Sequence, residues 1–116
     1  MARNPIFARR IKFEPLRSLS YADITTSYVA VGSATENPAH VAYISNITNG
    51  SLLFSFDGMN NHLIIPANGY FLLDISTNKV TQEGFWLAEG TTLYVKQFDT
   101  PTTGFVSFSL IYGDTQ

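Results

Sequence analysis

Residues 104–112 read GFVSFSLIY, and this stretch decides the fold class. Val106, Phe108, Leu110 and Tyr112 occupy alternate positions, interleaved with Ser107, Ser109 and Ile111. Successive side chains on a strand point to opposite faces, so this alternation is typical of a strand that covers one side of a hydrophobic core. We therefore predict a β-strand here.

Similar short apolar runs recur along the chain between turn signals. They predict about eight strands, at residues 25–32, 40–47, 51–57, 62–66, 69–75, 84–88, 91–98 and 104–112. No stretch of helical length has a 3.6-residue apolar period. Regularly spaced short strands favour an all-β, antiparallel β-sandwich of jelly-roll-like type. The pair Asn49-Gly50 predicts a hairpin between residues 44–48 and 52–56, and Asn68-Gly69 is expected to join 63–65 to 70–75.

Composition excludes several classes of protein. The 116 residues are 45% hydrophobic and only 14% charged, against about 25% charged in typical domains. The absence of cysteine excludes disulfide scaffolds, thiolate metal sites and thiol catalysis. No window approaches the ~18 apolar residues of a membrane span. No apolar segment of a secretory signal follows the N-terminal arginines, so we expect a cytoplasmic product.

Charge divides the chain into a basic N-terminal arm, 1–18, and an acidic β-sandwich domain, 19–116. Five basic residues against Glu14 give the first 17 residues a net charge of +4, whereas the rest of the chain carries −6. Pro5 and Pro15 interrupt any helix, so the arm is expected to be extended. Docking on an acidic protein neighbour would bury Phe7 and Phe13 and pair the arginines with carboxylates. The candidate contact residues are Arg3, Phe7, Arg9, Arg10, Lys12, Phe13, Arg17 and Trp86.

Two other readings of the arm stay open. Its arginines and phenylalanines could contact nucleic acid through phosphates and stacking, although the negative body would repel a duplex. The arm could also be a frayed terminus without a role. Trp86 with Phe85, and Tyr94 with Phe98, could form a carbohydrate platform, but a single tryptophan more often fills a core or an interface.

Catalytic and metal-binding patterns are weak. Asp57 and His62 could supply two ligands to a metal, but no third is evident. No serine lies in a Gly-x-Ser-x-Gly motif, and the glycines show no phosphate-binding pattern. The acidic residues of the body lie at turns or strand ends, where acids serve solvation and local hydrogen bonding. We expect a non-enzymatic protein without a metal or cofactor.

Ordered turn-and-strand signatures add a resemblance. They are 28–32 (YVAVG), 37–40 (NPAH), 44–49 (ISNITN), 54–58 (SFDG preceded by Phe), 65–69 (IPANG), 93–96 (LYVK) and the strand 106–112. In this order they resemble small virion proteins of tailed bacteriophages, over about residues 25–112. The arm lies outside the matched region.

The resemblance implies a non-enzymatic β-sandwich subunit present in many copies of a phage particle. Such a subunit would be a decoration or cement protein on the capsid, or a component of the head-to-tail neck. It would bind copies of itself and the major capsid, portal or neck proteins, and it would be located in the virion, which is assembled in the host cytoplasm. The alternative is a carbohydrate-binding sandwich of a tail fibre or secreted protein, and a third class is an internal virion protein that contacts DNA.

Overall fold

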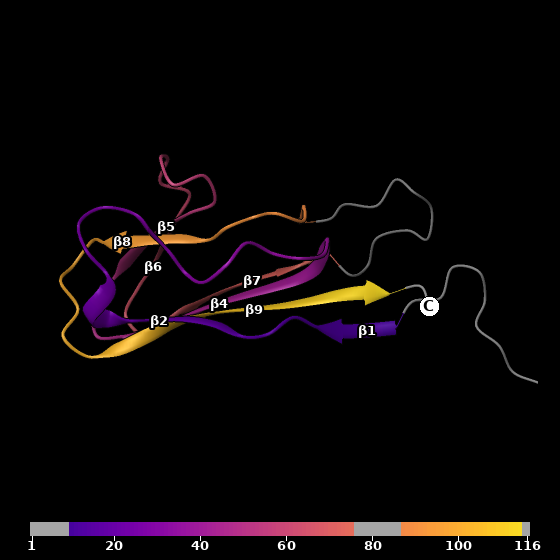
Figure 1. The fold of residues 1–116 in the computed structure, drawn as a ribbon. Coiled ribbons are helices and arrows are strands. Elements are labelled where there is room, and N and C mark those ends of the chain that lie inside the picture. Colours follow the sequence, from indigo (N-terminus) through magenta and orange to yellow (C-terminus); the bar gives the residue numbers. More distant parts are fainter. Residues whose placement is uncertain (1–9, 76–86, 115–116) are drawn as a thin grey trace, which may run out of the picture.

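The computed structural model describes residues 10–75 and 87–114, which form two antiparallel β-sheets (Figure 1). Sheet A contains β1 (Arg10–Phe13), β2 (Arg17–Ser20), β4 (Ala39–Thr48), β7 (Tyr70–Asp74) and β9 (Gly104–Asp114). Sheet B contains β3 (Val29–Ala30), β5 (Leu52–Ser55), β6 (Leu63–Ile65) and β8 (Tyr94–Gln97). A 3₁₀ turn, Tyr21–Asp23, follows β2. No described residues form a helix that is long and apolar enough to cross a membrane.

The strands pair in a nested order. The antiparallel pairs β2·β9 and β4·β7 lie in sheet A, and β3·β8 and β5·β6 lie in sheet B. Sheet A therefore runs β2-β9-β4-β7 and sheet B runs β3-β8-β5-β6. This order is that of a double-sheet jelly roll. The predicted all-β antiparallel sandwich is confirmed.

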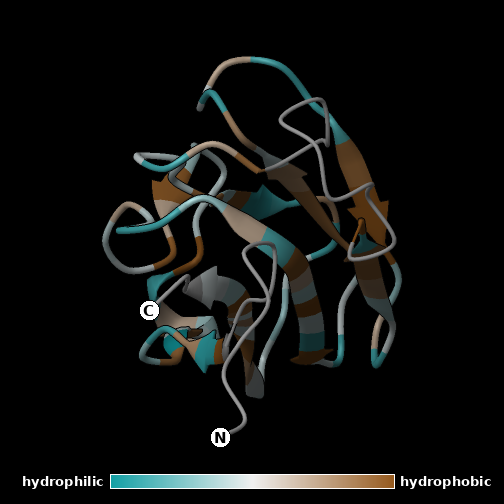
Figure 2. Ribbon diagram, turned by 90° about the vertical axis from the view of Figure 1, so that its right-hand side faces the viewer, coloured by the Kyte–Doolittle hydropathy of each residue, from teal (hydrophilic) through white to brown (hydrophobic). Residues whose placement is uncertain are grey.

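The core lies between the two sheets and is built from one side of each strand. Hydrophobic residues recur along the strands as brown bands separated by paler ones (Figure 2). On β9, Val106, Phe108 and Leu110 are buried, as their alternation predicts. They share the core with Ile44 on β4 and Phe54 on β5. Each side chain of this size contributes roughly 1.5–3 kcal/mol when removed from water.

The predicted hairpin at Asn49-Gly50 is wrong. The segment connects β4 in sheet A to β5 in sheet B, so the chain changes sheets there. A two-residue type I′ hairpin needs positive φ at both central residues, and neither Asn49 nor Gly50 has one. The buried side chain of Asn46 instead donates to the carbonyls of Gly50, Ile65 and Pro66. Asn68-Gly69 joins β6 to β7, as predicted, and there too the chain passes from one sheet to the other.

The first edge of sheet A is an interrupted strand. β1 and β2 both pair with β9, with Phe13 opposite Ile111 and Arg17 opposite Phe108. Three residues on this edge thus face two on β9, which is the signature of a bulge. Pro15 lies in the interruption, where a residue without an N–H costs no ladder hydrogen bond. Sheet A therefore includes residues on both sides of the predicted arm boundary at residue 18.

Other strands differ from prediction in extent. The segment predicted at 25–32 is a strand only at Val29–Ala30, and that predicted at 91–98 only at Tyr94–Gln97. The predicted strand 84–88 falls largely outside the described residues, although Leu87 forms an isolated bridge with Ala39.

Candidate protein-contact face

Sheet A carries large apolar side chains on its outer face as well as on the inner face that forms the core. Pairing registers place the same side of neighbouring strands in rows: Ser109 is opposite Tyr43, which is opposite Leu72. The next row contains Ser107, Ser45 and Tyr70. We call this surface the contact face. Its large side chains that are more than a third exposed are Ile11, Phe13, Tyr43, Ile47, Tyr70, Leu72 and Phe105, with Leu16 in the bulge beside them.

Charge is almost absent from the contact face. Among the described residues that these registers place on it, Asp74 alone is charged. The registers of sheet B also place one charged residue on its outer face: on β8 Lys96 pairs with Leu53, and its ammonium lies 4.7 Å from the ring centre of Tyr28. Contiguous apolar surface of this kind usually marks a protein-interaction site. The contact face is therefore the strongest candidate site among the described residues.

Serines form the floor of the contact face. Ser18, Ser107 and Ser45 lie side by side on β2, β9 and β4. Ser107 is only 8% exposed and Ser45 only 9%, although they point outward. Neighbouring side chains therefore cover Ser107 and Ser45, whereas Ser18 is exposed. The rings of Tyr43 and Tyr70 lie 5.5 Å apart beside Ser45.

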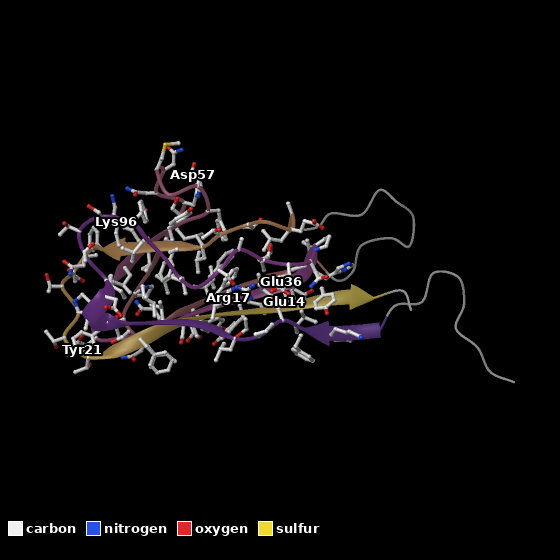
Figure 3. The ribbon with its side chains drawn as sticks, viewed as in Figure 1. Glu14, Arg17, Tyr21, Glu36, Asp57 and Lys96 are labelled. Atoms are coloured by element: carbon white, nitrogen blue, oxygen red, sulfur yellow. The ribbon has the colours of Figure 1, made fainter. Side chains whose placement is uncertain are left out.

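Beneath the edge of this sheet, Glu14 and Arg17 form a buried ion pair (Figure 3). An Nη of Arg17 lies 2.9 Å from a carboxylate oxygen of Glu14. The guanidinium also donates to the carbonyls of Pro15, Ser33 and Ala34. The Glu14 carboxylate accepts hydrogen bonds from the main-chain N–H groups of residues 36 and 37. The pair thus joins the interrupted strand to the loop 33–37.

These hydrogen bonds decide the pKa of Glu14. Burial alone raises the pKa of a carboxyl group, because it disfavours the charged form. The N–H of Glu36, the amide groups of Asn37 and the Arg17 guanidinium oppose this effect, and the pKa of Glu14 is lowered overall. Glu14 is therefore held ionised as a structural anchor.

The predicted contact residues have different positions. Arg3, Phe7, Arg9 and Trp86 lie outside the described residues, and of Arg10 only the backbone is described, paired with Asp114. Phe13 is 71% exposed on the contact face, and Lys12 is exposed on β1. Arg17 is buried and its guanidinium is bonded within the chain, so it offers no exposed group to a partner.

The sequence-based prediction missed most residues of the contact face. The missed residues are Ile11, Leu16, Tyr43, Ile47, Tyr70, Leu72 and Phe105. One signal was present in the sequence: residues 70–74 read YFLLD, which is apolar at both odd and even positions. A strand of this kind has two apolar faces, and only one of them can face the core of a two-layer sandwich.

The Asp57 loop is held by its own hydrogen bonds. One carboxylate oxygen accepts from the N–H groups of Met59 and Asn60, each at 2.8 Å. The N–H of Asn60, then that of Met59, lowers the pKa of Asp57. Nδ1 of His62 accepts from the N–H of Phe56, and its Nε2 lies 3.8 Å from Asp57. Within residues 10–75 and 87–114, no three His, Cys, Asp or Glu side chains are grouped to hold a metal.

No protein-family model, curated protein or solved structure matches this chain.

Proposed function

We propose that this chain is a non-enzymatic structural subunit of a tailed-phage virion. In this role it attaches to capsid or neck proteins through the N-terminal arm and the sandwich domain, and it decorates or stabilises the particle. The observation that carries the proposal is the almost uncharged apolar outer face of sheet A. A monomeric protein in solution rarely exposes an apolar face of this kind, whereas a subunit of an assembly covers it with a neighbouring protein.

Two further observations support the assignment. The jelly-roll strand order is common among capsid domains, and the turn-and-strand signatures resemble those of small phage virion proteins. The fold alone does not define a function, because lectin domains also use it. The contact face supports a role in assembly in particular, because protein interfaces are enriched in aromatic residues. Four aromatic residues are exposed on this face: Phe13, Tyr43, Tyr70 and Phe105.

The test is the composition of the particle. Virions released from the host that carries this gene are purified on a density gradient, and the chain is quantified by mass spectrometry against the major capsid protein. We expect many copies per particle, retained through repeated purification. A chain found only in the soluble lysate would contradict the proposal.

A glycan array tests the carbohydrate-binding alternative. Saturable binding that is lost in Trp86→Ala would support that alternative and contradict a purely structural role. Retention of DNA that depends on Arg9 and Arg10 would instead favour an internal, nucleic-acid-contacting virion protein.

A further inference from the structure

We infer that the contact face binds a second copy of this chain in a two-fold, face-to-face dimer. This inference goes beyond the proposed function and does not depend on the virion assignment, because it concerns the isolated chain in solution. Two properties of the contact face support it: its area and its lack of charge.

The exposed area matches one side of a standard protein interface. The large side chains of the contact face are each 36–73% exposed, and aromatic residues of this size have surfaces of about 150–250 Å². Together they offer roughly 800 Å², which is what each partner buries in a standard interface. A second copy supplies the same area in the same shape.

The lack of charge favours a copy of the chain over a charged partner. A two-fold contact brings each patch against an identical patch, so a patch with charges of a single sign would meet charges of the same sign. Asp74 is the one charged residue that the registers place on this face, and it lies on the outermost strand, β7. Two copies can therefore meet without like-charge repulsion at the centre of the interface.

Sedimentation equilibrium on the full chain tests the dimer, with matched variants on the two sheets. Leu72→Glu places a charge on β7 of sheet A, where Leu72 is 51% exposed. Ile64→Glu is the control, because Ile64 is 54% exposed on β6, the corresponding edge strand of sheet B. We expect twice the 12.9 kDa chain mass for the native chain and for Ile64→Glu. Leu72→Glu should weaken the dimer at least tenfold.

Circular dichroism checks that each variant is folded, and Tyr43→Lys replaces Leu72→Glu if the latter does not fold.

Several outcomes would overturn the inference. A native chain that stays monomeric at high micromolar concentration excludes the dimer, as does an open series of larger oligomers, which a closed two-fold contact cannot produce. If the dimer persists in Leu72→Glu and Tyr43→Lys, or dissociates in Ile64→Glu, its interface lies elsewhere on the molecule. A monomer that is nevertheless abundant in particles would leave the proposed function standing while this inference fails.

Discussion

The guanidinium of Arg17 contacts the carboxylate of Glu14 at 2.9 Å, and both side chains are almost inaccessible, at 5% and 1% exposure. The two residues lie on either side of Pro15, where the edge strand of sheet A is interrupted. Buried ion pairs add little net stability when complete, but the loss of one partner leaves an unpaired buried charge. The pair therefore stabilises one arrangement of the bulge and of the loop 33–37 against others.

Glu14→Gln removes the charge that pairs with Arg17. We expect the free energy of unfolding to fall by about 3 kcal/mol at neutral pH, the lower end for a broken buried pair, because three carbonyls still bind the guanidinium. Urea denaturation measures the loss. Glu36→Gln is the matched control, since its side chain is exposed and should change stability by less than about 0.5 kcal/mol. Equal losses in the two variants would contradict this role of Glu14.

The contribution of Glu14 should also depend on pH. Its pKa in the folded chain is lowered from the ordinary value of 4.5, so the unfolded state binds the proton more tightly. The stabilisation is fully present above about pH 4.5 and is lost as the pH falls through the lower, folded pKa. The difference in urea midpoint between the native chain and Glu14→Gln should therefore shrink below about pH 4.5. If the difference in urea midpoint instead grew on acidification, the pKa of Glu14 would be raised in the folded chain, which would contradict this prediction.

Asn46→Asp should be strongly destabilising, because Asn46 is fully buried at the crossing between the sheets. Its amide nitrogen donates to three carbonyls, and a carboxylate oxygen in its place would face all three. We expect a loss of about 3 kcal/mol or more, measured by thermal or urea denaturation. Asn49→Asp is the control: it is exposed and keeps the oxygen that accepts from the N–H of Thr102. Near-native stability of Asn46→Asp would show that these hydrogen bonds are dispensable.

Gly104→Ala tests the start of β9. The φ of Gly104 is +95°, and a Cβ there would lie 1.8 Å from the carbonyl oxygen of Ile47 on the neighbouring strand. Gly90→Ala has a similar φ, +82°, but its Cβ would meet nothing within 4 Å. Gly90→Ala should therefore cost only the backbone strain, about 1–2 kcal/mol. Gly104→Ala should cost clearly more, and equal unfolding midpoints in the two variants would exclude the steric explanation.

Patterns local in the sequence were sufficient to predict the fold class. Alternation along β9 identified its buried residues, and turn dipeptides marked where strands end. Sheet membership was not predictable at Asn49-Gly50, because the same dipeptide suits a hairpin or a crossing. The choice depends on partners distant in sequence, such as the carbonyls of Ile65 and Pro66 that bind Asn46.

The candidate site was only partly predictable, for a related reason. The basic composition of the first residues suggested an arm, yet Arg17 is paired with the Glu14 carboxylate and hydrogen-bonded to the carbonyls of residues 33 and 34. Three-residue spacing across a proline gives no sign of such a pair. The contact face required strand registers, because Phe13, Tyr43 and Leu72 come from three strands that are distant in sequence.

Sheet A has its last strand in its interior: β9 pairs with β1 and β2 on one side and with β4 on the other. A ribosome delivers β9 after every other described strand, and pairing across such long sequence separations is slow. Until β9 emerges, β2 and β4 have no strand between them, and the rows of the contact face cannot align. A nascent chain therefore cannot engage a neighbour through this face before β9 has been synthesised and has paired with β2 and β4.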